Sequence, residues 1–133
     1  MYKMPAEYQP HRATLMIWPV RPGRWGKDPR PAQAPFVRVF GAITQGEDLY
    51  LLAGPGHLEE ARAATAHLDP TRVHLLCIDS DDAWARDVGP TFVQDEAGRL
   101  KGISWRFNAW GGEVDGLYAD WQKDDAVASA FCH

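Results

Sequence analysis

The stretch that decides the fold is VHLLCIDSDDAWARDVGP, residues 73–90. Its first part, Val73 to Ile78, is an apolar run that predicts a buried β-strand. The acidic segment that follows, Ser80–Pro90, brings three acids, a tryptophan and an arginine to the C-terminal end of that strand. Open α/β sheets bind their ligands at this end of their strands, so we expect a functional site here. A carboxylate beside an aromatic ring suits a cationic, planar ligand.

The acidic segment has two interpretations when its residues are taken alone. In the structural one, Ser80 or Asp81 caps a helical turn and Arg86 forms a surface ion pair. In the functional one, Trp84 and Asp87 share a face of one helical turn, so that Asp87 holds a guanidinium and Trp84 covers its π surface. Burial decides between them, because a carboxylate–cation contact at ~4 Å contributes about 4 kcal/mol at an effective dielectric of 20 but about 1 kcal/mol in water.

Upstream of this stretch the pattern alternates between strand and helix. Apolar runs predict strands at Thr14–Trp18 and Asp48–Ala53. Apolar residues at helical spacing predict a helix after each strand; the first has Pro35 in its first turn and ends near Gly46, and the second stops near Asp69-Pro70. The positions that carry the two patterns are Phe36, Val39, Phe40 and Ile43, then Leu58, Ala61, Thr65 and Leu68.

Downstream, strands at Thr91–Gln94 and Leu100–Phe107 flank the turn residues DEAG and predict a β-hairpin. The order β-α-β-α-β followed by a hairpin indicates the α/β class with right-handed crossovers. Residues 108–125 lack periodicity and contain paired glycines, so we expect either a second wall of the site or an Ω-loop plugged by Trp110. A helix of about two turns is expected to begin at Asp124-Asp125.

Composition bounds the classes of protein to consider. The chain has 133 residues, a formal net charge of −4 and no cluster of lysine or arginine, which predicts one globular domain and argues against nucleic acid or anionic membrane as the main partner. It has no apolar run of ~20 residues and no signal-peptide pattern, so we expect a cytoplasmic location. Cys77 and Cys132 are expected to be reduced, the histidines show no metal-ligand pair, and Trp18 and Trp105 are expected in the core.

Several motifs in order along the chain resemble the agmatine deiminases. The opening MPAEY at residues 4–8 with His11, the strand Thr14–Trp18 with Pro19, and PAQ at residues 31–33 are similar to the start of that family. The two strongest matches are DAWARDVGPT at residues 82–91 and WRFNAWGG at residues 105–112. The resemblance extends from Met4 to the end of the chain.

The resemblance implies a fold and a chemistry. The family belongs to the guanidine-modifying superfamily, whose pentein-type fold is a five-bladed α/β propeller, and residues 1–133 are expected to be the N-terminal portion of one such domain, about the first blade and part of the second. The implied reaction hydrolyses agmatine to N-carbamoylputrescine and ammonia, a step toward putrescine. Carboxylates hold the guanidinium, a cysteine thiolate forms a covalent intermediate and a histidine protonates the leaving ammonia, with no cofactor or metal.

Carried over by motif, Asp87 matches the guanidinium-binding aspartate and counts as catalytic. Trp84 matches the aromatic wall beside the substrate, and Trp110 is expected to line the pocket near the substrate's chain. Asp82 and Arg86 are expected to support the motif. The family's second carboxylate, its histidine and its nucleophilic cysteine come from later segments, and Cys132 does not lie in the family's glycine-rich nucleophile motif. We therefore expect the chain alone not to turn over agmatine.

Other interpretations remain open at this point. Within the family, a bacterial-type peptidyl-arginine deiminase differs only in the tail of its substrate. Outside it, the chain is a non-catalytic module that binds guanidinium groups, or an inactive gene remnant. Missing neighbours of a first blade would leave apolar surface exposed, so the isolated chain is expected to form homo-oligomers or to fold poorly.

Overall fold

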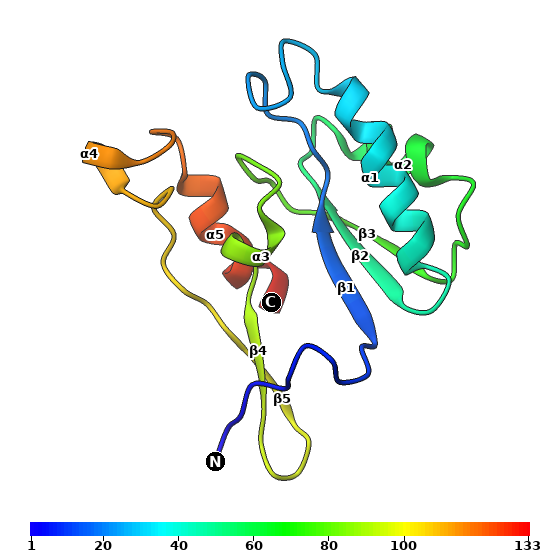
Figure 1. Cartoon of the computed structure of the whole chain (residues 1–133), viewed down its shortest axis with the longest axis vertical. Helices are drawn as coiled ribbons and strands as arrows, with labels where there is room; N and C mark the ends of the chain where they lie inside the picture. Colours follow the sequence, from blue (N-terminus) through cyan, green and yellow to red (C-terminus); the bar gives the residue numbers. More distant parts are fainter.

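Two separate sheets organise the chain. In the computed structural model, which describes residues 1–133, the parallel sheet has the order β1-β2-β3 and the antiparallel hairpin pairs β4 with β5 (Figure 1). The register is regular, and Met16 of β1 and Leu75 of β3 both pair with Leu51 of the central strand. The predicted order of elements is confirmed. The strands are β1 (Ala13–Ile17), β2 (Asp48–Ala53), β3 (Val73–Cys77), β4 (Thr91–Gln94) and β5 (Leu100–Ile103).

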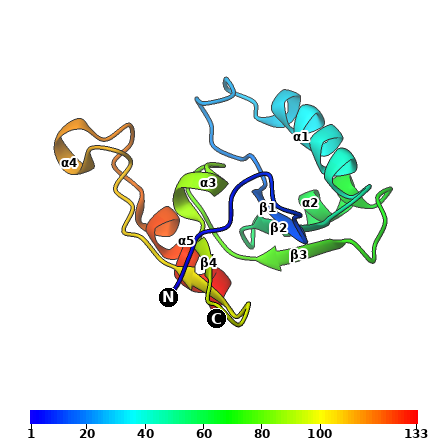
Figure 2. The same ribbon diagram turned by 60° about the horizontal axis from the view of Figure 1, so that its bottom comes forward.

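Helices pack on both faces of the parallel sheet. On one face lie α1 (Arg30–Ile43) and α2 (Leu58–Thr65), and on the other lie the short α3 (Ala85–Val88) and α5 (Gln122–Cys132) (Figures 1 and 2). Side chains of β2 alternate between the two faces, because successive residues of a strand point in opposite directions. Two apolar clusters result, one of Trp18, Phe40, Leu49, Leu51, Ala53 and Ala61 and one of Ile17, Leu52, Val88 and Val127.

The third strand differs from its prediction. We expected Val73–Ile78 to be buried, but the residues of β3 are only partly buried and Cys77 is exposed. The reason is its place at the edge of the sheet, where no further strand covers it. Trp18 is 1% exposed and confirms its place in the core, whereas Trp105 is 62% exposed and the expectation for it was wrong. β5 ends at Ile103, before Trp105, and the Trp105 indole donates a hydrogen bond to Thr91 at 3.0 Å.

Two helices begin earlier than predicted. α1 starts at Arg30, so Pro31 occupies its first turn and Pro35 lies inside it. The extra turn is anchored by Gln33, whose buried side chain donates to the Pro19 carbonyl. α5 starts at Gln122 rather than at Asp124 and has 11 residues, about three turns. The second predicted helix, in contrast, ends early, because α2 stops at Thr65 rather than near Asp69-Pro70.

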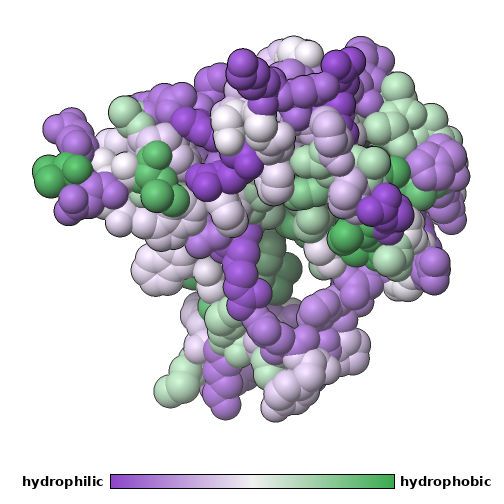
Figure 3. All heavy atoms as spheres, turned by 45° about the horizontal axis from the view of Figure 1, so that its top comes forward, coloured by the Kyte–Doolittle hydropathy of each residue, from purple (hydrophilic) through white to green (hydrophobic).

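The segment between β5 and α5 forms a lobe that projects from the two sheets. It contains a single helical turn, α4 (Gly112–Asp115), within the range predicted to be irregular. Apolar atoms lie at the tip of this lobe (Figure 3), where Val114 is 89% exposed and Leu117 64% exposed. The expected apolar surface is therefore present. None of the helices is both long and apolar enough to cross a membrane.

Candidate functional site

One acid of the acidic segment and one acid of α5 each accept hydrogen bonds from the backbone of the other element. The Asp81 carboxylate accepts hydrogen bonds from the N–H groups of Lys123 at 3.0 Å and Asp124 at 3.3 Å, which caps the N-terminus of α5. In return, the Asp124 carboxylate accepts from the N–H groups of Asp81 at 2.8 Å and Asp82 at 3.2 Å. The structural interpretation is thus confirmed in part: Asp81 caps a helix, although this helix lies about 40 residues away.

The two carboxylates of this exchange differ in burial, since Asp81 is only partly buried. Asp124 is fully buried, and its second oxygen accepts the Tyr118 hydroxyl at 2.6 Å. Burial raises the pKa of Asp124 and also that of Asp81, since each loses hydration in its ionised form. Burial, aided by the hydrogen bond to Asp124, likewise raises the pKa of Tyr118. Asp124 and Tyr118 are buried, and all three groups are engaged in contacts that position the segment.

The next acid, Asp82, is also committed to internal contacts. Its side chain is 1% exposed; one oxygen accepts the Ala83 N–H at 2.8 Å and the other faces the Nε of Arg24 at 3.4 Å. Arg86 forms an exposed ion pair with Glu7, as the structural interpretation expected. The role of both residues as support for the motif stays a prediction.

Asp87 is the acid of the segment that remains free. It is the third residue of α3, and its N–H donates to the Trp84 carbonyl at 2.9 Å. Its carboxylate is exposed and makes no hydrogen bond or ion pair in the structure. Trp84, at the N-cap of the same turn, is partly buried and its indole N–H has no acceptor. A free carboxylate therefore lies on the same turn as an aromatic ring, but this chain does not bury it, so the burial that would favour the functional interpretation is not present.

An aromatic cluster extends this arrangement to the second motif. The rings of Trp84 and Trp110 meet edge to face, with centroids 5.5 Å apart, and Phe107 packs on Trp110 at 5.0 Å. Tyr118 completes the cluster at 6.5 Å from Trp110. Trp110 is 47% exposed, so part of its indole remains available to a ligand. The structure thus brings together Trp84 and Trp110 from motifs 26 residues apart.

The backbone around Trp110 has an unusual conformation that depends on glycine. Ala109 and Trp110 both adopt left-handed conformations, with φ of 54° and 63°, and Gly112 follows at 64°. Gly111 lies so close to the following turn that a Cβ there would be 2.3 Å from the Asp115 carbonyl carbon. Paired glycines therefore permit the tight turn that turns the Trp110 ring toward Trp84.

Sequence reasoning missed the loop between β1 and α1. Arg21 and Arg24 in this loop contact the aromatic cluster, with the Arg21 guanidinium carbon 4.1 Å above the Tyr118 ring and that of Arg24 5.2 Å from the Trp84 ring. Arg21 also donates to the Asp81 carbonyl at 3.1 Å and to Asp120 at 2.9 Å. A usable signal existed, because the loop follows β1 at the same edge of the parallel sheet as the acidic segment.

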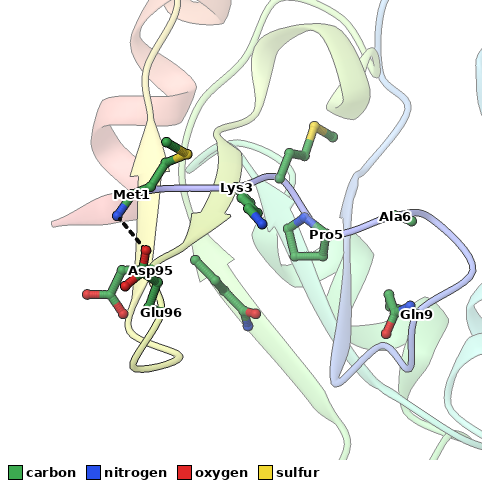
Figure 4. Close-up of a pocket in the computed structure, with 9 residues that line it drawn as sticks. Met1, Lys3, Pro5, Ala6, Gln9, Asp95 and Glu96 are labelled. Carbon is green, nitrogen blue, oxygen red and sulfur yellow. Dashed lines mark hydrogen bonds and ion pairs between the residues drawn. The ribbon is translucent and has the colours of Figure 1, made fainter.

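A cavity of about 400 Å³ lies elsewhere, between the N-terminal segment and the β4–β5 hairpin (Figure 4). Lys3 pairs with Gln94 there, and the N-terminal amine contacts Glu96 at 3.3 Å. Its lining includes none of the predicted site residues. The side chain of Asp95 is already engaged by Arg99 at 2.7 Å. This cavity therefore gives no reason to move the candidate site.

Comparison with known proteins places the chain in a family. The model of the Porphyromonas-type peptidyl-arginine deiminases matches residues 3–133. The chain belongs to this family. The agmatine deiminase of Stutzerimonas stutzeri is 51% identical over 127 residues, covering 96% of this chain and 34% of the relative. That of Pseudomonas aeruginosa is 49% identical over 127 residues, with the same coverage of 96% and 34%.

The family's solved structures confirm the fold class. The agmatine deiminase of Enterococcus faecalis matches with a TM-score of 0.90 and 38% identity, over 98% of this chain and 35% of that one. The chain therefore has part of the pentein-type α/β fold of the family. It spans about a third of the length of these relatives. The resemblance found in the sequence to agmatine deiminases is confirmed.

Proposed function

We propose that this chain supplies part of the guanidinium site of a deiminase whose substrate is agmatine. Asp87 binds the guanidinium and is the catalytic residue, while Trp84 covers the planar group and Trp110 borders the aliphatic chain. The observation that carries the proposal is the free carboxylate of Asp87 in a segment where Asp81 and Asp82 are already engaged. The relatives of about 50% identity are agmatine deiminases, which supports the choice of substrate.

The chemistry of the group suits a guanidinium. A carboxylate accepts two parallel N–H bonds from such a group, which strengthens and orients the contact. The face of an indole adds a cation–π contribution of about 0.5–2 kcal/mol, larger when water is excluded. Because Asp87 is exposed, its attraction for a cation is weak until further protein or ligand surface covers it. Binding to the chain alone is therefore expected to be weak and dependent on Asp87.

Turnover requires groups that do not meet Asp87 in this chain. The ion-paired histidines contact acids away from the acidic segment, namely Glu47, Glu60 and Asp48. The Cys132 thiol packs against Gly102 in β5. We therefore propose that the chain binds agmatine without hydrolysing it, and that the longer family members perform the reaction toward putrescine in the cytoplasm. No cofactor or metal takes part in this proposal.

A second candidate substrate is peptidyl-arginine, which the description of the matching family favours. It presents the same guanidinium with a peptide in place of a primary amine. Comparing agmatine with an N-acetyl-arginine amide separates the two, since the first has a cationic tail and the second does not.

Indole N–H signals in a nitrogen-15 spectrum give the test. Adding agmatine should shift the signals of Trp84 and Trp110, assigned with tryptophan-to-phenylalanine variants, and leave that of buried Trp18 in place. Putrescine, which has no guanidinium, should cause smaller shifts. The shifts should disappear in Asp87→Asn and persist in Asp115→Asn, the matched control. Equal shifts with putrescine, or shifts that survive Asp87→Asn, would overturn the proposal.

A further inference from the structure

The guanidinium of Arg24 occupies a place that resembles the proposed ligand site. Its Nε lies 3.4 Å from an oxygen of Asp82, and its central carbon lies 5.2 Å from the centre of the Trp84 ring. The Asp82 side chain is 1% exposed and that of Arg24 is 33% exposed. A carboxylate and an indole thus hold a guanidinium that belongs to the chain itself.

This contact changes the number of carboxylates available beside Trp84. Asp82 lies two residues before Trp84 and Asp87 three residues after it. If Arg24 were absent, Asp82 would keep only the Ala83 N–H, and its second oxygen would lose its partner. A cation that reached this oxygen would be attracted more strongly than by exposed Asp87, because Asp82 lies in a less polar environment. A ligand guanidinium would then have two alternative positions on the same ring.

The loop that carries Arg24 makes further contacts through a second arginine. Arg21, three residues earlier, stacks on Tyr118 at 4.1 Å and donates to the Asp81 carbonyl at 3.1 Å. Its second terminal nitrogen pairs with Asp120 at 2.9 Å. These contacts attach the loop both to the acidic segment and to the lobe that bears Trp110.

We propose that Arg24 is a positioning residue, which neutralises Asp82 and so restricts a bound guanidinium to Asp87. This inference rests on the proposed function for the identity of the ligand. Arg24 acts through Asp82 and Trp84 and does not contact the substrate. Its removal should therefore open a second position for a guanidinium without destroying the first.

The experiment is a calorimetric titration with agmatine on variants of the full chain. Asp87→Asn alone should weaken binding by up to about fivefold, the effect of losing one exposed charged contact of about 1 kcal/mol. In Arg24→Ala, Asp82 accepts the ligand, so adding Asp87→Asn should weaken binding by less than about twofold. Adding Asp82→Asn to Arg24→Ala should restore the full dependence on Asp87. Lys27→Ala, in the same loop and with the same change of charge, should behave as the unchanged chain.

The outcomes separate this inference from the function on which it rests. An equal effect of Asp87→Asn with and without Arg24 would overturn the role of Arg24 and leave the proposed function intact. Binding seen only in Arg24→Ala, and lost with Asp82→Asn, would show that Asp82 rather than Asp87 binds the guanidinium and would contradict both the proposed function of Asp87 and the restriction of the ligand to it. Absence of binding in every variant would overturn both.

Arg24→Gln guards against a variant that does not fold, because the amide still donates to Asp82 while the positive charge is gone. It should reproduce the reduced dependence on Asp87. Melting curves followed by circular dichroism identify which variants are folded before they are titrated. If Arg24→Gln folds and keeps the full dependence on Asp87, the proposed role of Arg24 is wrong.

Discussion

Four aspartates within or against the acidic segment differ in what their carboxylates contact. Asp81 caps α5, Asp124 binds the backbone of the segment and Asp82 pairs with Arg24, whereas Asp87 has no internal partner. The same residue type therefore serves as cap, anchor, counterion and candidate ligand group. Burial follows this division, since Asp82 and Asp124 are buried and Asp87 is exposed. The free carboxylate is available because the others are engaged.

The buried anchor predicts how stability varies with pH. Burial raises the pKa of Asp124 above that of an unfolded aspartate, about 3.9. Its contribution is therefore fully present below pH ~3.9 and is lost as the pH rises through the raised value. Asp124→Asn keeps an oxygen for the two N–H donors and an amide that donates to Tyr118, but it has no charge to bury.

Urea denaturation of both proteins from pH 3.5 to 8 measures the effect. The unfolding free energy of the unchanged chain, relative to Asp124→Asn, should fall across this range, by about 1.4 kcal/mol per unit of pKa difference. A relative stability that rises with pH would show that ionised Asp124 is favoured by the fold and would contradict this account.

At the scale of elements, the sheet was predictable and the packing between elements was not. Asp48–Ala53 was predicted residue for residue, because a central strand is apolar on both faces. The hairpin followed from its turn residues. The prediction that β3 is buried was wrong, because hydrophobicity along a strand does not reveal whether a neighbouring strand covers it. Pro35 was misplaced because a proline is also tolerated inside a helix when the extra turn gains contacts such as that of Gln33.

For the candidate site, the sequence singled out individual residues but not their partners, and the roles of these residues stay predictions. Asp87, Trp84 and Trp110 came from local spacing and motif, and the structure brings the two tryptophans into contact. The true target of the Asp81 cap lies about 40 residues away, and Arg24 reaches Asp82 across 58 residues. Such pairs depend on tertiary packing, so the spacing of neighbouring residues carries no information about them.

The turn that positions Trp110 gives a prediction at this scale. Gly111→Ala should lower the unfolding free energy by about 1–3 kcal/mol, because the new Cβ would overlap the backbone at Asp115. Gly56→Ala is the matched control, since a Cβ there meets nothing within 4 Å, and it should stay within about 0.5 kcal/mol. Thermal melts compare the two. Similar stability in both variants would mean that the lobe relaxes freely and does not fix Trp110.

For the whole molecule, the site lies where the two sheets, the β1–α1 loop and the projecting lobe meet. Arg21 and Arg24 connect the loop to the acidic segment, and Trp110 connects the lobe to it. The chain spans about a third of the length of its relatives, and large apolar side chains such as Trp105 and Val114 are exposed on it. The candidate site is open to solvent on the side of Asp87. Protein surface that covered Asp87 would exclude water and so strengthen the attraction between its carboxylate and a cation.

The central claim is that Asp87 is the acid left free to bind a guanidinium. The most direct measurement is the ratio of the agmatine dissociation constants of Asp87→Asn and the unchanged chain, obtained by calorimetry at low salt. We predict a ratio of about five, while Asp115→Asn, an exposed acid of the lobe, changes the constant by less than about twofold. A ratio near one for Asp87→Asn, with agmatine still bound, would contradict the claim.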